Sequence, residues 1–499
     1  MAKGKKKNQS VRCVLTLPLL TEPWQDKIIE TRFHIMERIK NILISKELGK
    51  LKSLERTREW KKLKKDIEKC KEKDEEEKKI LYEQRSKMIY DAGLSKNHFV
   101  VDITPIQKHF AEHIATQIAH MSASDVWRSF EKYFYGSGQR IHFVEYDKLN
   151  SIACEKIGNG MNLKDWKLVW GGGRCPNKIS LTIKVRLPRN DYEREMMQKP
   201  IKYLRVVRKW MKTRYKYYLQ ITFEGNPVIK SRPVGNGRVG IDIGTQTIAW
   251  SSDTEVRLAE LAAGIKQNQK KIAELKRKMD RSRRAMNPQN YNSNGTAKRG
   301  RHKWVKSKRY IRMRGILREL ERKNADIRKY EHTCMVNHIL SLGNQIYIED
   351  MNWIALARRA KRTKKNKNGR YAKKKRFGKS IGKRAPGMFM LILKQKCNLV
   401  GGEYHEVDKS TFKASQYDHI TDTFRKKPLG KRWNVLGGTD NVQRDMYSSF
   451  LIKNSDDTYM QTDRNRCIDT YTHFKELHDI EIERLMNENK KHLSSMGVA

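Results

Sequence analysis

Three acidic residues in different local settings carry the strongest chemical signal in the sequence. Asp242 in RVGIDIGTQTIAW and Glu349 in NQIYIEDMNW each end a short apolar run typical of a buried strand, and Asp445 in VQRDMYSSFLI stands where an amphipathic helix should begin. A carboxylate beside a hydrophobic core is unfavourable unless a cation binds there. Three converging carboxylates can hold two divalent ions about 3.5–4 Å apart, which supports in-line phosphodiester cleavage. The sequence therefore predicts a nuclease that uses two Mg²⁺ ions, with Mn²⁺ as a substitute in vitro.

The residues around Asp242 favour one fold for the domain that would carry this site. Gly240 and Gly244 flank the acidic position, and the apolar stretch TIAWSS that follows predicts a second strand in a hairpin. Together with the strand that ends at Glu349, this pattern is typical of an RNase H-like α/β domain. Asp350 should point to the opposite side of that strand, so we expect a supporting or structural role for it.

Two other acidic residues compete for the third position. Asp463 in TDRNRCID superficially fits an Asp-x-Asn variant of the motif, and Asp469 follows it closely. Asp463 precedes a mostly polar segment. Asp445 is preferred because a buried helix face continues after it, formed by Met446, Phe450, Leu451 and Ile452.

The chain is strongly basic. Its 499 residues include 107 Lys and Arg against 56 Asp and Glu, a formal charge of +51 with a pI near 10. This imbalance implies a large polyanionic partner, which nucleic acid provides and a small acidic substrate does not. The hydrophobic content of 37% is sufficient for real cores, and the length allows about two to four domains. No apolar run reaches membrane-spanning length, and seven scattered cysteines without a CxxC pair indicate a reducing cytoplasm.

The N-terminal half changes from strand to helix and back to strand patterns. Residues 11–20 predict a first strand, and 22–134 predict a helical insertion. Five later segments predict strands: RIHFVEY, WKLVWGG, ISLTIKVRL, IKYLRVVRKWM and YKYYLQITFEG. We therefore expect 1–21 and 135–226 to form a β-barrel-like module. It would present basic and aromatic residues that follow a nucleic-acid backbone and stack on bases, namely Lys184, Arg186, Arg205, Arg208, Lys209, Trp210, Arg214, Tyr215 and Tyr217.

The C-terminal half predicts a nuclease domain with two insertions. Pro and Gly in 227–237 predict a linker, followed by a nuclease domain over 238–409 and 443–499. A helical hairpin is expected over 256–340, with a near-heptad seam of Leu258, Leu261, Ile265, Ile272, Leu275 and Met279. Residues 358–384 hold about 15 basic residues and no acidic one, too charged to fold without a counterion. We expect this run, within a loop over 354–385, to order on nucleic acid near the active site through Arg358, Arg359, Lys373, Lys374, Lys375 and Arg376.

Other motifs give weaker signals. GNGMN (158–162) and WGGGRCP (170–176) are Gly-rich but lack the Gly-Lys-Ser/Thr ending of a P-loop, so nucleotide hydrolysis has little support. His332 and His338 in HTCMVNHILSLG are expected in a helix packed on the sheet. We interpret both as structural, because two-metal chemistry can generate its own hydroxide.

The order of these motifs resembles the TnpB family of transposon-encoded RNA-guided nucleases and the compact type V CRISPR effectors. The resemblance rests on GIDIGTQTIAWSS, IYIEDMNW, RFGKSIGKRAPGMFMLILKQKCNLVGGEYHEVDKSTFKASQ and QRDMYSSFLI, within about 238–455. It implies that Asp242, Glu349 and Asp445 are a RuvC-like triad, that the β-barrel-like module is wedge-like and that the helical insertion is a recognition domain. It also implies an enzyme of the prokaryotic cytoplasm, a monomer or a homodimer on one guide RNA, that opens and cuts double-stranded DNA beside a short flanking motif.

One segment departs from this family. Members usually carry a CxxC…CxxC zinc ribbon between the second and third acidic motifs, whereas residues 410–442 contain no cysteine. His419 alone cannot supply the four N or S ligands of a structural zinc site. We expect a remnant without structural zinc, held by aromatic residues such as Tyr417 and Trp433 and still placed to handle the target strand.

Two other classes of protein stay open. An RNase H-fold DNA transposase or resolvase that acts without RNA would share the triad but needs no large basic N-terminal half. A nuclease-inactive, RNA-guided DNA-binding repressor is the second class, and an intact triad argues against it. Copurifying RNA would separate the expected nuclease from the first class, and magnesium-dependent cleavage would separate it from the second.

Overall fold

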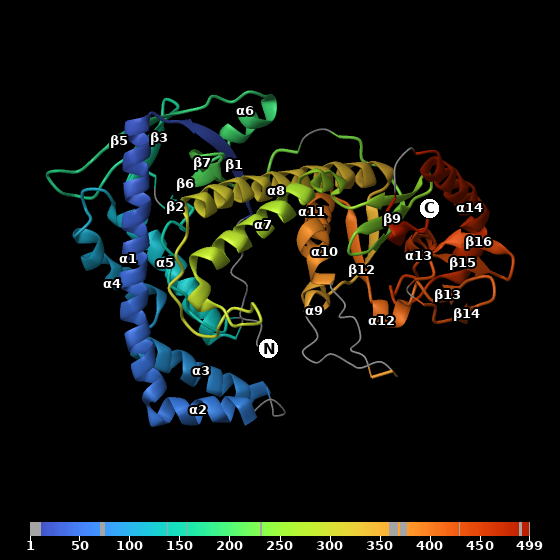
Figure 1. The fold of residues 1–499 in the computed structure, drawn as a ribbon, viewed down its shortest axis with the longest axis horizontal. Helices are drawn as coiled ribbons and strands as arrows, with labels where there is room; N and C mark the ends of the chain where they lie inside the picture. The colour runs from blue at the N-terminus through green and yellow to red at the C-terminus, as the bar shows by residue number, and fades with distance from the viewer. Residues whose placement is uncertain are drawn as a thin grey trace. The chain divides into compact units, whose positions relative to one another are not determined.

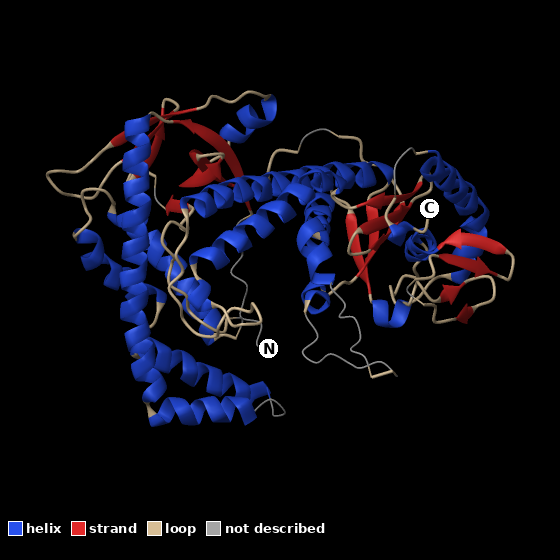
Figure 2. Cartoon of the chain, in the orientation of Figure 1, coloured by secondary structure: helices blue, strands red, loops and turns tan. Residues whose placement is uncertain are grey.

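The computed structural model describes residues 11–69, 75–136, 138–155, 157–229, 232–358, 368–369, 377–428, 430–488 and 492–498. They form a mixed α and β chain that divides into two compact units, Met1–Val228 and Ile229–Ala499 (Figure 1). The division falls inside the predicted linker. Each unit has strands and helices of its own, as Figure 2 shows.

The N-terminal unit contains a group of helices inserted after its first strand. They are α1 (Pro23–Arg56), α2 (Arg58–Lys69), α3 (Glu75–Asp91), α4 (Lys96–Lys108) and α5 (Thr116–Phe134). Helix α1 begins at a capping box formed by Glu22 and Gln25, with Pro23 in its first turn. Its apolar stripe joins α4 and α5 in one core around Phe33 and Phe99. All five helices lie within the range predicted to be helical.

A seven-stranded sheet completes this unit. Its strands are β1 (Arg12–Leu20), β2 (Ser151–Cys154), β3 (Met161–Lys164), β4 (Lys167–Trp170), β5 (Leu181–Val185), β6 (Ile201–Met211) and β7 (Arg214–Glu224), with α6 (Asp191–Met197) between β5 and β6. The order is β2-β6-β7-β1-β5-β4-β3, and neighbouring strands are antiparallel. In β5, Leu181, Ile183 and Val185 are buried while Lys184 is exposed, the alternation expected of a strand with one face on a core.

The segment RIHFVEY (140–146) forms no strand, contrary to the sequence prediction. Side chains of α1 bind its backbone instead. Asn41 exchanges two hydrogen bonds with the backbone of Val144, at 2.8 and 2.9 Å. Glu37 accepts hydrogen bonds from the N–H groups of Asp147 and Leu149, both at 3.1 Å. These polar partners satisfy the backbone where a neighbouring strand would otherwise be needed.

A five-stranded sheet forms the centre of the C-terminal unit. Its strands are β8 (Arg238–Ile243), β9 (Thr247–Ser251), β10 (Val256–Glu260), β11 (Gln345–Glu349) and β12 (Glu403–Val407), in the order β10-β9-β8-β11-β12. The first three are antiparallel neighbours, whereas β8, β11 and β12 run parallel. Helices α8 (Lys308–Leu342) and α11 (Pro386–Leu399) pack on one face, and α13 (Arg444–Lys453) and α14 (Arg464–Asn487) pack on the other.

The predicted helical hairpin begins later than expected. Residues 256–260 form strand β10, because Val256 and Leu258 pair with β9 across the sheet. Helix α7 (Lys266–Met286) then pairs with α8, and Leu275 and Met279 pack against Met313 and other residues of α8. Leu258 and Leu261 therefore belong to the two cores of the sheet and not to the predicted seam.

The remaining elements of this unit are short. They are α9 (Trp353–Ala357), α10 (Phe377–Arg384), α12 (Lys409–Phe412), and the strands β13 (Tyr417–Asp418), β14 (Thr423–Phe424), β15 (Trp433–Leu436) and β16 (Asp440–Gln443). β13 pairs with β14, and β15 pairs with β16. Among the described helices, none is both long and apolar enough to cross a membrane.

Candidate metal centre

Strand alternation places Asp242 and Glu349 on the same face of the central sheet. Ile241 of β8 and Ile348 of β11 are register partners in parallel strands, and both belong to the core under α8 and α11. The next residues, Asp242 and Glu349, therefore point to the face that α13 and α14 cover. Glu349 is the last residue of β11, so both carboxylates lie near the same end of the sheet.

Helix α13 brings the third carboxylate to this face because Gly240 allows a close approach. A Cβ at Gly240 would overlap the backbone oxygen of Ser449 and the backbone nitrogen of Lys453. The helix therefore lies directly on β8, and Asp445 is the second residue of that helix. In the sequence Gly240 is notable only as a glycine beside the acidic position, and no local pattern predicts that a helix backbone contacts it.

A methyl group at Gly240 should disturb this contact and lower stability, whereas the same substitution at a matched control glycine should raise it. We expect Gly240→Ala to lower the free energy of unfolding by about 1–3 kcal/mol through overpacking. Gly315 lies in α8 with no heavy atom within 4 Å of an added Cβ. Gly315→Ala should therefore raise stability by about 0.5–1 kcal/mol. Thermal unfolding of the two variants measures both changes in stability. Equal changes in the two variants would contradict the close contact between Gly240 and α13.

The first turn of α13 is fixed by Gln443. Its side-chain oxygen accepts a hydrogen bond from the backbone N–H of Met446 at 2.8 Å, and its amide nitrogen donates to the carbonyl of Met496 at 3.1 Å. Gln443 itself is fully buried. A buried cap of this kind fixes the direction in which Asp445 leaves the helix.

The electrostatics show that the three carboxylates influence one another. Burial raises the pKa of the Asp242 carboxyl well above its usual range, and the charges of Asp445 and Glu349 raise it further, while Arg444 and Arg432 act in the opposite direction. Burial also raises the pKa of Glu349, against the charge of Lys409. A cation bound between these carboxylates would relieve this repulsion.

Two arginines lie against the third carboxylate, and sequence reasoning missed both. Nε and Nη2 of Arg444 each lie 3.3 Å from Oδ1 of Asp445, and Nη1 of Arg432 lies 3.7 Å from its Oδ2. The two arginines are coupled, since the backbone N–H of Arg444 donates to the carbonyl of Arg432 at 2.8 Å. The position of Arg444 directly before Asp445 was the only signal in the sequence.

The competing acidic residues are engaged elsewhere or exposed. Asp463 caps α14 by accepting a hydrogen bond from the backbone N–H of Arg466 at 3.1 Å. Asp350 and Asp469 are exposed. Asp242 thus interacts electrostatically with Glu349 and Asp445, whereas Asp463 is engaged as a helix cap and Asp350 and Asp469 are exposed.

The donor atoms suit a hard divalent cation. All three residues offer carboxylate oxygens, the ligands that Mg²⁺ and Mn²⁺ prefer. Within the described residues, the carboxylates of Asp242 and Glu349 form no hydrogen bond or ion pair, although both are partly buried. The residues present therefore fit a magnesium or manganese site, and their role as ligands stays a prediction.

Arg208, predicted to bind nucleic acid, is instead a buried ion-pair centre in the N-terminal unit. Its guanidinium pairs with Glu30, with Glu37 at 3.3 Å and with Asp147 at 3.1 Å, and the side chain is inaccessible to solvent. Its Nε also donates to the carbonyl of Leu149 at 2.8 Å. The reason is strand alternation, because Leu204, Val206 and Arg208 all face the core.

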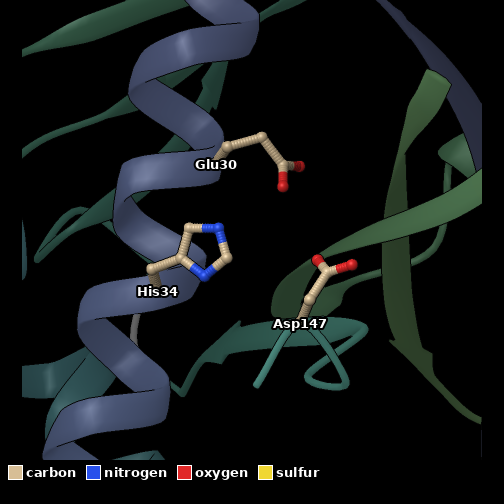
Figure 3. Close-up of side chains that lie close together, drawn as sticks. All are labelled: Glu30, His34 and Asp147. Atoms are coloured by element: carbon tan, nitrogen blue, oxygen red, sulfur yellow. The ribbon is translucent and has the colours of Figure 1, made fainter. Parts of the chain in front are cut away.

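Tyr215 is also buried, with its hydroxyl donating to Asp147 at 3.0 Å, so a base-stacking role is wrong for it as well. Tyr217 is likewise buried. Figure 3 shows Glu30, His34 and Asp147 turned toward one another, and their ligand atoms lie within 4.8 Å of one another. Both carboxylates of this cluster pair with the buried Arg208 and each also accepts a tyrosine hydroxyl, from Tyr217 on Glu30 and from Tyr215 on Asp147, so we assign no metal to it.

The other residues predicted to bind nucleic acid differ in their solvent exposure and in their ion pairs. Lys184, Lys209 and Arg214 are exposed, and Arg205 and Trp210 are half-buried. Arg186 pairs with Glu193 at 2.8 Å, so that ion pair would have to open for it to bind phosphate. In the basic run, Arg358 is exposed just after α9, whereas Arg359, Lys373, Lys374, Lys375 and Arg376 lie outside the described residues.

The segment expected to replace the zinc ribbon has an aromatic core. Tyr417 packs on Phe424 with ring centroids 4.8 Å apart. His419 is buried, and its Nδ1 lies 2.8 Å from the hydroxyl of Tyr447, while its ring lies 4.6 Å from that of Tyr471. His419 is therefore part of the aromatic core, and its Nδ1 is engaged with Tyr447.

The expected absence of structural zinc can be tested directly. Elemental analysis of the purified protein should find well under one equivalent of zinc, because residues 410–442 offer no thiolate and His419 is engaged with Tyr447. Treatment with a chelator should leave the melting temperature unchanged. About one equivalent of tightly held zinc would show that ligands distant in sequence had been missed.

Comparisons with known proteins give a limited picture. No protein-family model and no curated protein matches the chain. Among solved structures, the chain is similar to one in the cryo-EM structure of a Cas12f1–sgRNA–target DNA complex, at 12% identity and a TM-score of 0.46, covering 88% of this chain and 98% of that one. It is also similar to a chain of a CRISPR–Cas12f ternary complex, at 12% identity and a TM-score of 0.25, covering 89% and 99%. These TM-scores are too low to define the fold by themselves.

Proposed function

We propose that this chain is an RNA-guided DNA endonuclease that hydrolyses phosphodiester bonds at a two-metal site. The observation that supports the proposal is that Asp242 and Glu349 lie near one end of the central sheet on the face that α13 covers, and that the charges of Glu349 and Asp445 raise the pKa of Asp242. The strand order β10-β9-β8-β11-β12, with a parallel half beginning at β8, supports the RNase H-like assignment of this unit.

Each group at the site has a separate role in the proposed reaction. Asp242, Glu349 and Asp445 would hold two divalent ions, which supply an attacking hydroxide and stabilise the leaving oxygen. The sheet fixes the first two carboxylates, and the capped first turn of α13 fixes the third. Arg444 and Arg432 balance the charge of Asp445 and add positive potential where a phosphate would enter.

The assignment of nucleic-acid partners rests on charge and on motif resemblance. A formal charge of +51 favours a polyanionic partner. The acidic motifs resemble those of TnpB-like RNA-guided nucleases, and the similar Cas12f1 structure contains an sgRNA and target DNA. Guide RNA and double-stranded target DNA are therefore the proposed partners.

The decisive experiment has two readouts on one preparation. The protein is purified from its expression host, and the copurifying RNA is sequenced. A plasmid carrying a match to that RNA beside randomised flanking bases is then incubated with the complex with Mg²⁺ or with chelator. We expect a defined RNA and cleavage only with Mg²⁺. Cleavage without RNA would indicate a transposase or resolvase, and RNA-dependent binding without cleavage would indicate a repressor.

The basic run provides a further prediction. Replacing Lys373, Lys374, Lys375 and Arg376 by Ser should weaken nucleic-acid binding and slow cleavage. Each lost phosphate contact should flatten the log–log salt dependence of binding by roughly 0.7–0.9. The melting temperature of the free protein should not fall, because a run without acidic partners is not expected to fold alone. A variant with wild-type salt dependence and cleavage would identify the run as a passive linker.

A further inference from the structure

The two Gly-rich segments, to which the sequence assigned no role, meet at one cavity in the N-terminal unit. Residues 158–160 and 171–173 line it together with the ends of α4 and α5 and the hairpin β3–β4. Its volume is about 780 Å³. This is the size range of small-molecule and cofactor sites, roughly 300–1,000 Å³.

The glycines are needed because the backbone is tightly packed around the cavity. The N–H of Gly171 donates to the carbonyl of Gly160 at 2.9 Å, which joins the two loops. The N–H of Gly173 donates to the carbonyl of Ala111 at 2.5 Å, and a Cβ on Gly172 would overlap the carbonyl of Glu112. The loops are thus held against the corner between α4 and α5, and the cavity has a fixed wall.

The cavity is lined by cationic side chains. Lys108, Lys164, Arg174 and Lys178 line it, and no Asp or Glu among the described residues does so. None of these four side chains forms an ion pair within the described part of the chain. The first residues of the 19-residue helix α5 also line it, and no side chain caps that helix. The helix dipole therefore adds to the positive potential.

Neutral hydrogen-bonding groups stand beside these cations. The amide side chains of Gln117 and Asn162 line the cavity, are half-buried, and have no hydrogen-bond partner within the described residues. An amide side chain offers two donors and an acceptor, the pattern that reads the edge of a base. Gln107, by contrast, is fully engaged with Ile114 and Thr116.

We propose that this cavity receives an unpaired nucleotide of a bound nucleic-acid strand, with its phosphates near the four cations and its base edge near Gln117 and Asn162. The inference rests on the proposed function only in taking a polynucleotide as the source. A cavity of this volume encloses one or two nucleotides but not a duplex. Recognition of unstacked bases in pockets is typical of single-stranded regions. A free nucleoside triphosphate is disfavoured because the described lining offers no acidic residue to hold its magnesium.

Photo-crosslinking tests the cavity and identifies the strand. The copurified RNA is resynthesised with 4-thiouridine and reassembled with the full chain in one arm. In the other arm, unmodified RNA complex is bound to target DNA containing 4-thiothymidine. After irradiation, mass spectrometry maps the crosslinked peptides. We expect crosslinks within 104–117 or 158–180 in one arm. The arm in which they occur identifies RNA or DNA as the strand that supplies the nucleotide. Crosslinks confined to other segments in both arms would overturn the proposal.

A charge-matched pair of variants makes the test independent of net charge. Lys164 and Lys167 are register partners in the hairpin β3–β4, and both are exposed, but only Lys164 lines the cavity. Lys164→Ser should lose the cavity crosslink and flatten the salt dependence of binding by about 0.7, whereas Lys167→Ser should keep both. Equal behaviour of the two variants would refute the site. Guided cleavage without a cavity crosslink would reject this inference alone, whereas absence of RNA and of cleavage would reject the proposed function.

Discussion

Alanine in place of Asp242, Glu349 or Asp445 should reduce the rate of DNA cleavage on the order of 10³-fold, the scale expected when one preorganised electrostatic group is removed from an active site. Each change would remove one of the three proposed metal ligands. RNA and target binding should persist, because the change makes a chain of charge +51 still more positive. Single-turnover cleavage and filter binding on the same complexes measure the two effects separately.

Asp463→Ala is the matched control for Asp445→Ala. Both residues lie at helix starts, but Asp463 caps α14 by accepting the N–H of Arg466. Its loss should lower the free energy of unfolding by about 1 kcal/mol and leave the cleavage rate unchanged at a temperature where the variant is folded. Near-wild-type cutting by Asp445→Ala together with loss in Asp463→Ala would overturn the choice of the third carboxylate.

A metal titration adds a readout that does not depend on turnover. Calorimetric titration of the wild-type complex with Mn²⁺ should show binding that Asp242→Asn weakens, because an amide keeps the shape of the side chain but loses its charge. Similar binding curves for both proteins would place the metal elsewhere.

The positions of the strands near the site could be predicted because apolar runs and acidic ends coincide. In β8 and β11 the core residues alternate with the residues that face α13. The sequence pattern therefore predicts both the strand and the face of the sheet on which each side chain lies. The start of the hairpin was misjudged, because Val256 and Leu258 fit both a helical seam and a strand. The close approach at Gly240 and the contact of Arg432 with Asp445 depend on tertiary packing, which a local pattern does not contain.

The misassigned residues in the N-terminal unit have a common physical cause. In IKYLRVVRKWM, Arg208 is in phase with Leu204 and Val206, and this phase was the available signal for burial. A basic residue in a basic chain was instead expected to be exposed. Its partners Glu30 and Glu37 lie on α1, more than 170 residues away in sequence, so no local pattern could have paired them.

Replacement of Arg208 should give the largest loss of stability in the N-terminal unit. Arg208→Ala leaves Glu30, Glu37 and Asp147 without their common cation, and Glu37 is buried. Removing one partner of a buried ion pair lowers stability by about 3–5 kcal/mol. The ring faces of Phe33 and Tyr215, each 4.5 Å from the guanidinium, would lose a contact as well. We expect the melting temperature of the RNA-free full chain to fall and amide exchange to increase in α1 and β6.

Lys209→Ala provides the control from the adjacent position. Lys209 is exposed and faces away from the core, so its loss should leave stability within about 0.5 kcal/mol and weaken RNA binding at low salt. Arg208→Ala should show the reverse at temperatures where it is folded, with RNA affinity kept and stability lost. An Arg208→Ala protein that melts like wild type but binds RNA poorly would show that the guanidinium contacts nucleic acid, as the sequence alone had predicted. The two adjacent variants therefore separate the structural role of Arg208 from the predicted binding role of Lys209, because strand alternation assigns the two side chains to opposite faces of the same strand.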